Sequence, residues 1–277
     1  MKTVLITGAS SGIGLELAKI HAKQKDNLIL IARSENKLNE LASQLREKHK
    51  VNVEILSLDL SLIDSPQKVF DFAKEKNITV DYLINNAGFG DFDFFAETNW
   101  NKQAQMIDLN IKSLTALTHL FLRPMMLRKS GKIMNVASTA AFLPCPMMAV
   151  YAATKHYVLA FSEALANELS DKGITVTALC PGATTSGFQD AAAMQDSGFM
   201  TNVKFATAES VAQYGYKSMM KGKRVAIPGF FNKLSAGSIR LTPRKLVTKI
   251  ARKLIDRKVV KKQININYKK SALFLLL

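Results

Sequence analysis

A tyrosine and a lysine four residues apart are the side chains of this sequence best suited to proton transfer. In Tyr151-x-x-x-Lys155 the two side chains share one face of a helix, so the ammonium lies near the phenol. A phenol titrates at about 10, and a neighbouring positive charge favours the phenolate. We therefore expect Lys155 to lower the pKa of Tyr151 and make it a general acid or base.

A serine upstream can take part in the same chemistry. Ser138 follows an apolar run at residues 132–136, and ligands in open α/β sheets bind beyond the carboxyl ends of the strands. Its hydroxyl can donate a hydrogen bond to an oxygen that gains negative charge during a reaction. Serines at strand ends also commonly bond their own backbone, and the sequence leaves both interpretations open.

A glycine-rich loop near the N-terminus has the features of a phosphate site. Gly8, Gly12 and Gly14 stand in VLITGASSGIG, between an apolar run and a segment with helical spacing. The N–H groups and the dipole of a helix start attract anions, and glycines let an anion approach the backbone. The spacing differs from the G-x-G-x-x-G fingerprint, and no Lys-Ser/Thr pair follows as in a Walker loop. A tight turn without a ligand is the alternative.

Arg33 ends the second apolar run, where folds that bind NAD carry an acidic residue. A carboxylate there would repel a 2′-phosphate, whereas a guanidinium can hold it with two hydrogen bonds. The sequence therefore predicts NADP(H) rather than NAD(H). The competing interpretation is a solvated surface arginine.

Apolar runs and helical segments alternate along the chain and must position these residues. The runs fall at 4–7, 28–32, 53–58, 82–84, 132–136, 175–180 and 225–227. Continuous apolar strands separated by amphipathic helices are typical of a parallel sheet buried on both faces. We expect an α/β doubly wound fold, with a seven-stranded parallel sheet and helices on both faces.

These motifs together resemble the short-chain dehydrogenase/reductase family, in its NADP-preferring type, over residues 2–255. The resemblance rests on Thr7-Gly8-Ala9-Ser10-Ser11-Gly12-Ile13-Gly14, Asn85-Asn86-Ala87-Gly88, Asn110, Ser138, Tyr151, Lys155 and Pro181-Gly182. It implies a Rossmann-type fold and an enzyme that moves a hydride between NADP(H) and a ketone, aldehyde or secondary alcohol.

The resemblance also implies a role for each site residue. Tyr151 would exchange the proton with the substrate oxygen, Lys155 would hold the nicotinamide ribose, Ser138 would orient the carbonyl, and Asn110 would keep a water in a proton relay. The implied cofactor contacts are Gly8, Ser10, Ser11, Gly12, Ile13, Gly14, Arg33, Asp59, Leu60, Asn86, Ala87, Gly88, Tyr151, Lys155, Pro181, Gly182, Thr184 and Ser186. Ser186 departs from the threonine that relatives usually carry, but it keeps a hydroxyl.

The composition is that of a globular protein, with 48% hydrophobic and 22% charged residues in a chain of 277. We expect one domain at 1–256, with an apolar substrate lid at about 186–205, and a basic tail at 257–277. Two cysteines without a C-x-x-C partner and scattered histidines predict neither disulfides nor a metal site. With no signal peptide and no membrane span in the sequence, we expect a soluble, cytoplasmic protein.

The positive charge is concentrated near the C-terminus. The net charge is +16, and residues 233–270 contain 13 Lys/Arg against one acid. Residues 243–255 are amphipathic, and we expect them to form the last helix of the domain with its apolar face on the sheet. Contact with an anionic membrane surface is the alternative. Nucleic acid is not an expected partner, because no recognition motif accompanies the charge.

Two further expectations concern the substrate and the assembly. An apolar lid favours an apolar substrate, and Phe92, Phe94, Phe95, Met147 and Met148 either extend that pocket or are ordinary packing. The apolar segments 107–125 and 157–169 resemble the helices that pair in the family, which implies a homodimer or homotetramer. The alternative function is a dinucleotide-sensing Rossmann protein without catalysis, bound to membranes through its basic C-terminus.

Overall fold

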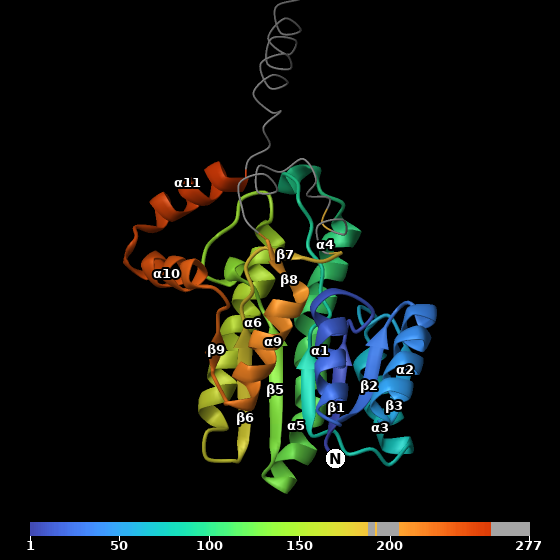
Figure 1. The fold of residues 1–277 in the computed structure, drawn as a ribbon. Helices are drawn as coiled ribbons and strands as arrows, with labels where there is room; N and C mark the ends of the chain where they lie inside the picture. The colour runs from blue at the N-terminus through green and yellow to red at the C-terminus, as the bar shows by residue number, and fades with distance from the viewer. Residues whose placement is uncertain (188–191, 193–204, 256–277) are drawn as a thin grey trace, which may run out of the picture.

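A parallel sheet forms the centre of the molecule. The computed structural model describes residues 1–187, 192 and 205–255, and within them seven strands form one sheet in the order β3-β2-β1-β4-β5-β6-β9 (Figure 1). The strands are β1 Thr3–Thr7, β2 Asn27–Ala32, β3 Val53–Ser57, β4 Tyr82–Asn85, β5 Gly131–Val136, β6 Ile174–Leu179 and β9 Val225–Ala226. Every neighbouring pair is parallel. The predicted sheet is confirmed.

Helices bury both faces of this sheet. One face is covered by α1 Gly12–Lys23, α2 Glu35–His49 and α9 Ala208–Met220, and the other by α3 Ser65–Glu75, α5 Leu114–Arg128 and α6 Ala149–Glu168. Along β1, Val4 and Ile6 pack against the first layer and Leu5 against the second. Two buried faces require apolar residues at every strand position, which explains the continuous apolar runs in the sequence.

The remaining elements connect or extend this core. They are η1 Phe95–Glu97, α4 Trp100–Ile107, the π-helix η2 Asp108–Ser113, η3 Thr139–Ala141, β7 Thr184–Thr185, β8 Ala206–Thr207, α10 Phe230–Ser238, η4 Ile239–Leu241 and α11 Arg244–Ile255. A small second sheet, β7 with β8, was not predicted. The strand order reverses between β1 and β4, and such a point opens a crevice at the carboxyl ends of the strands.

The last helix does not lie where the sequence predicts. Figure 1 shows α10 and α11 off one side of the molecule, beyond the carboxyl ends of the strands. The buried residue Ile255 packs with Phe92 and Met106 rather than with strand residues. After the edge strand β9, the chain turns away through Gly229, whose φ is +88°. The expectation that this helix packs on the sheet is therefore wrong.

Two predicted segments fall largely outside the described residues. Of the predicted lid at 186–205 the structure describes 186, 187, 192 and 205, and the tail at 257–277 lies wholly outside. The predicted domain boundary at 256 also lies there. Within the described part of the chain, no helix combines the length and the apolar character needed to cross a bilayer.

Candidate active site

One cavity of about 630 Å³ lies at the carboxyl ends of the strands, within the size range of small-molecule sites. Nearly all the predicted site residues line it, although they come from the loops and helices that follow six different strands. Those on its wall are Gly8, Ser10, Ser11, Gly12, Ile13, Arg33, Asp59, Leu60, Asn86, Ala87, Gly88, Ser138, Tyr151, Lys155, Pro181, Gly182, Thr184 and Ser186. Gly14 and Asn110 are the two predicted residues that do not line the cavity.

The glycine loop between β1 and α1 gives the cavity a wall of backbone. Gly8 and Gly12 have φ angles of +66° and +55°, in the left-handed region that favours glycine. A Cβ on Gly12 would lie 3.1 Å from the Cβ of Ser186 across the cavity wall. Ser11 precedes α1, and its side chain makes no capping hydrogen bond. The first N–H groups of α1 are therefore left to other acceptors, as a phosphate site requires.

Gly14, which does not line the cavity, packs closely against the glycine loop. It lies inside α1, and a Cβ there would overlap the carbonyl oxygen of Gly8 and lie 2.5 Å from Nδ2 of Asn86. Only a residue without a side chain lets α1 pass this close to the loop. Gly14 thus fixes the direction of the helix whose N-terminus faces the cavity.

Thr7 joins the glycine loop to the loop after β4, a role that sequence reasoning missed. The buried Thr7 Oγ1 accepts hydrogen bonds from the backbone N–H groups of Asn86 and Ala87, both at 3.0 Å. In return, Asn86 Nδ2 donates to the Thr7 carbonyl oxygen at 2.9 Å. The only signal in the sequence was the threonine at the end of the first apolar run.

The basic residues at the end of β2 line the same cavity as the glycine loop. Arg33 is exposed, and its carbonyl oxygen accepts a hydrogen bond from Ser57 Oγ at 3.0 Å. Lys37, in the first turns of α2, also lines the cavity. Asp59 is held by Ser61, whose N–H and Oγ donate to Oδ1 at 2.9 and 2.7 Å. Arg33 is thus exposed where an anionic ligand in the cavity can reach it.

Helix α6 and the loop after β5 form another part of the cavity wall. They bring Tyr151 and Lys155 of α6 together with Ser138 of the loop. Tyr151 and Lys155 are 8% and 5% exposed. Lys155 Nζ donates to the Val136 carbonyl oxygen at 2.8 Å and lies 5.8 Å from the centre of the Tyr151 ring. Ser138 Oγ accepts from the Ala140 N–H at 3.1 Å. Ser138 therefore caps η3 and also lines the cavity.

The pKa of Tyr151 moves in the direction opposite to the one predicted. Burial raises the pKa of Tyr151 to about 12, and its hydrogen bond with Ser138 acts in the lowering direction. Burial lowers the pKa of Lys155 to about 8. Lys155 Nζ is directed at a backbone carbonyl oxygen, so burial rather than the ammonium sets the pKa of the phenol. At neutral pH the structure holds Tyr151 as a protonated phenol.

Asn110 lies directly behind the cavity wall, in the π-helix that joins α4 to α5. Its Nδ2 donates to the Phe89 carbonyl oxygen at 3.0 Å and to Thr154 Oγ1 at 3.1 Å, and its Oδ1 accepts from the Phe89 N–H at 3.2 Å. A Cβ on Gly88 would lie 2.9 Å from Asn110 Oδ1 and 3.4 Å from Lys155 Nζ. Asn110 therefore fixes the loop after β4 against α6.

The remaining wall of the cavity is largely apolar. It is formed by Phe89, Leu143, Cys145, Met148, Ala251 and Ile255, among others. Burial raises the pKa of Cys145 to about 12, so its thiol stays protonated. Of the five Phe and Met residues considered from the sequence, Met148 lines the cavity. The sequence missed Ala251 and Ile255, because it placed their helix on the sheet.

Comparison with known proteins identifies the family. The model of the family described as short chain dehydrogenase matches residues 2–197. The chain belongs to the short-chain dehydrogenase family. The glycine loop and the Tyr151, Lys155 and Ser138 cluster described above both fall inside the matched residues.

The relatives of this short-chain dehydrogenase differ in what they are named for. The very-long-chain 3-oxoacyl-CoA reductase of Mus musculus is 33% identical over 183 residues, which are 64% of this chain and 57% of that protein. The chain thus matches less than two thirds of this relative's length. A short-chain dehydrogenase from Sphingobium yanoikuyae, solved in complex with NADPH, is 31% identical with a TM-score of 0.78, over 87% of this chain and 95% of that one.

A third protein, whose structure is known, has a similar fold but a different bound cofactor. A short chain dehydrogenase/reductase from Burkholderia phymatum, solved in complex with NAD, is 24% identical with a TM-score of 0.76. The alignment covers 87% of this chain and 92% of that one. The bound cofactors of similar folds therefore do not choose between NAD and NADP for this chain.

Proposed function

We propose that this short-chain dehydrogenase is an NADP(H)-dependent carbonyl reductase or alcohol dehydrogenase for an apolar ketone, aldehyde or secondary alcohol. The observation that carries the proposal is the set of residues that line this one cavity together. A backbone cradle for phosphate and the cationic Arg33 share it with Tyr151, Ser138 and Lys155. A protein that only senses a dinucleotide has no need of the three latter side chains.

The chemistry divides between cofactor and protein. When bound, NADPH supplies the hydride that reaches the carbonyl carbon of the substrate. Tyr151 gives its hydroxyl proton to the carbonyl oxygen, so that one hydride and one proton turn the ketone into an alcohol. The raised pKa of Tyr151 keeps this proton on the phenol at neutral pH, where it is available to the carbonyl oxygen. The Ser138 hydroxyl steadies the same oxygen, and the Lys155 ammonium stabilises the phenolate left behind.

Positive charge on the cavity wall favours NADP(H) over NAD(H). Arg33 and Lys37 are two cationic side chains on the cavity wall beyond the glycine loop. A 2′-phosphate distinguishes NADPH from NADH, and guanidinium binds phosphate with charge-assisted hydrogen bonds. The NADPH complex of the Sphingobium yanoikuyae relative is consistent with this assignment.

The apolar wall around Tyr151 favours an apolar substrate. Leu143, Met148 and Ile255 offer this region little that could hydrogen-bond to a sugar or a charged acid. The name of the Mus musculus relative, a 3-oxoacyl-CoA reductase, describes a ketone on a long acyl chain, which has the same apolar character. The cytoplasmic location, the homo-oligomer and the single domain at 1–256 with a tail remain proposals from the sequence.

The test is a screen for NADPH oxidation with straight-chain ketones of increasing length. We expect turnover to improve with chain length and Tyr151→Phe to lose roughly 10²–10⁴-fold in rate, the typical contribution of a general acid. Tyr157→Phe is the matched control, because Tyr157 lies on the same helix but bonds Thr115 on the molecular surface. Full turnover by Tyr151→Phe contradicts the proposal.

A further inference from the structure

The two C-terminal helices of the described chain expose an unusual number of large apolar side chains. We call α10, η4 and α11 together the α10–α11 surface, residues 230–255. Its exposed apolar residues are Phe230, Phe231, Leu234, Leu241, Leu246 and Ile250. Phe231 is 82% and Leu241 is 91% exposed. Single exposed apolar residues are ordinary, but a group along one continuous segment marks an interaction surface.

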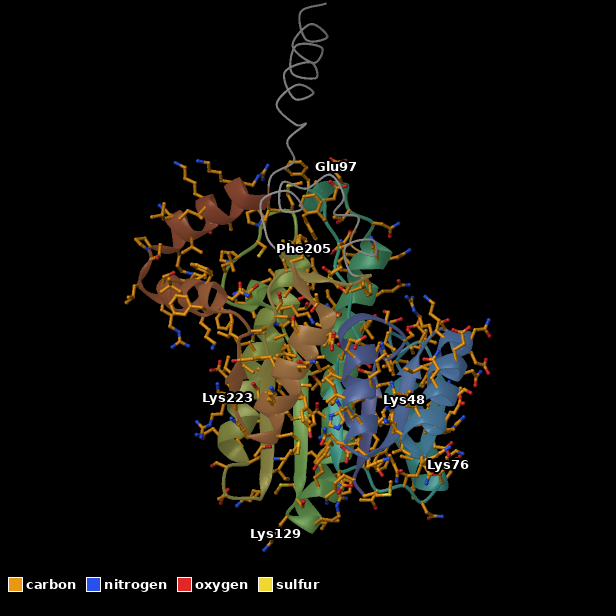
Figure 2. The ribbon with its side chains drawn as sticks, in the orientation of Figure 1. Lys48, Lys76, Glu97, Lys129, Phe205 and Lys223 are labelled. Atoms are coloured by element: carbon orange, nitrogen blue, oxygen red, sulfur yellow. The ribbon has the colours of Figure 1, made fainter. Side chains whose placement is uncertain are left out.

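The same surface is strongly basic. Residues 227–255 contain no Asp or Glu. The basic residues of this stretch are Lys233, Arg240, Arg244, Lys245, Lys249, Arg252 and Lys253. Figure 2 shows nitrogen-tipped side chains projecting from α11 away from the rest of the molecule. The apolar side chains are thus surrounded by positive charge with no acid in the segment to neutralise it.

Helix α11 carries two apolar stripes, one buried and one partly exposed. Val247, Ala251 and Ile255 recur every four residues and are buried against the protein. Leu246 and Ile250, also four residues apart, are 47% and 48% exposed. Packing accounts for the first stripe, but within the described chain it leaves the second stripe partly in solvent.

We propose that the α10–α11 surface docks on an anionic lipid membrane. Helices that lie in a membrane interface combine exposed Phe and Leu with Lys and Arg, whose long chains reach the headgroups while the apolar side chains enter the acyl region. Anionic headgroups supply the negative charge that this segment lacks. A second copy of the chain is a poorer partner, because two copies of an acid-free surface would bring like charges together.

Docking would also place the cavity beside the lipid. The buried stripe of α11 contributes Ala251 and Ile255 to the cavity wall, and the exposed side of the same helix carries Leu246 and Ile250. An apolar substrate dissolved in the membrane would then meet the helix that borders its site. This consequence rests on the proposed function, whereas the docking itself does not.

The experiment is co-sedimentation of the full chain with vesicles, and it does not depend on enzyme activity. One set contains phosphatidylcholine alone and the other phosphatidylcholine with phosphatidylglycerol. We expect binding to the anionic vesicles, at least about tenfold weaker for Phe230→Ser/Phe231→Ser. For Lys245→Gln/Lys249→Gln we expect about fivefold weaker binding for each charge removed.

Matched controls carry the same changes elsewhere on the surface. Leu62→Ser/Ile63→Ser replaces two adjacent exposed apolar residues, and Lys48→Gln/Lys129→Gln removes two exposed charges. Lys129 lies at the opposite end of the molecule from α10 and α11 in Figure 2. Both controls should bind as the unchanged chain does. Leu246→Ser/Ile250→Ser provides a second apolar pair if the phenylalanine pair alters folding, which thermal unfolding would reveal.

Two results would overturn the proposal. The tail contains six Lys/Arg at 257–270, and changing them to Gln in the full chain isolates their share. If that change abolishes vesicle binding while Phe230→Ser/Phe231→Ser leaves it intact, the tail and not the α10–α11 surface binds lipid. If the phenylalanine pair instead dissociates an oligomer in sedimentation velocity without lipid, and vesicle binding is unchanged, the surface serves a second copy of the chain.

Discussion

Arg33→Ala should change which cofactor the protein prefers. The substitution removes an exposed guanidinium from the cavity wall and leaves the apolar core unchanged. Two unit charges 4 Å apart attract by about 1 kcal/mol in water and about 4 kcal/mol at an effective dielectric near 20. Since Arg33 lies at the surface, we take about 2 kcal/mol, which corresponds to about thirtyfold weaker NADPH binding. NADH lacks the 2′-phosphate, so its affinity should not change.

The assay is a fluorescence titration of both cofactors at low and high salt. The ratio of NADH to NADPH dissociation constants should fall about thirtyfold in Arg33→Ala, and the loss should shrink as salt screens the unchanged protein. Lys37→Ala, on the same wall, should lose less NADPH affinity than Arg33→Ala, because an ammonium binds phosphate as a single point charge. Lys48→Ala, outside the cavity, should lose nothing. An unchanged ratio in Arg33→Ala would refute the assignment of the 2′-phosphate to this residue.

Three further predictions test the structure around the site. Gly14→Ala should lower the free energy of unfolding by about 1–3 kcal/mol, because its methyl group overlaps the Gly8 carbonyl oxygen. The control is Gly237→Ala in α10, whose added methyl group would have nothing within 4 Å. In a urea titration this control should raise the free energy of unfolding by up to about 1 kcal/mol. Thr7→Val should lower the free energy of unfolding by about 2 kcal/mol and weaken NADPH binding, because the N–H groups of Asn86 and Ala87 lose their acceptor. An unchanged free energy of unfolding would contradict the role of Thr7 in joining the two loops. Burial lowers the pKa of Lys155 from 10.5 in the unfolded chain to about 8, so between these values the unfolded state binds more protons and the free energy of unfolding should rise by about 3 kcal/mol with pH. About 2 kcal/mol of this rise falls between pH 8 and pH 10. In denaturation curves at these two pH values Lys155→Met should lack it, and an identical rise in both proteins would show that the pKa of Lys155 is not lowered.

The sheet and most of the cavity wall could be predicted from the sequence because both depend on local pattern. A strand buried on two faces must be apolar throughout, as Leu28 to Ile31 are, and the strand ends of a parallel sheet converge at one edge. Residues as distant as Gly12 and Tyr151 therefore meet on one cavity wall. The identity of each loop residue followed from the resemblance to a family, and its placement followed from the topology.

Other features depend on tertiary contacts that leave no local pattern. The π-helix at Asp108–Ser113 turns Asn110 toward Phe89 and Thr154, and no spacing in the sequence marks the wider turn. The amphipathic pattern of α11 shows that one face is covered, but not whether a sheet or a loop cluster covers it. The pKa of Tyr151 depends on its burial in the folded protein, which the spacing of Tyr151 and Lys155 does not reveal.

The transfer of an isotopic label tests the central claim most directly. NADPH deuterated at the transferred position of nicotinamide C4 is incubated with an apolar ketone, and the product is examined by mass spectrometry. We expect an alcohol that carries deuterium on its carbinol carbon with the unchanged protein, and little product with Tyr151→Phe. An alcohol without deuterium, or the same labelled yield from Tyr151→Phe, would contradict hydride transfer assisted by Tyr151.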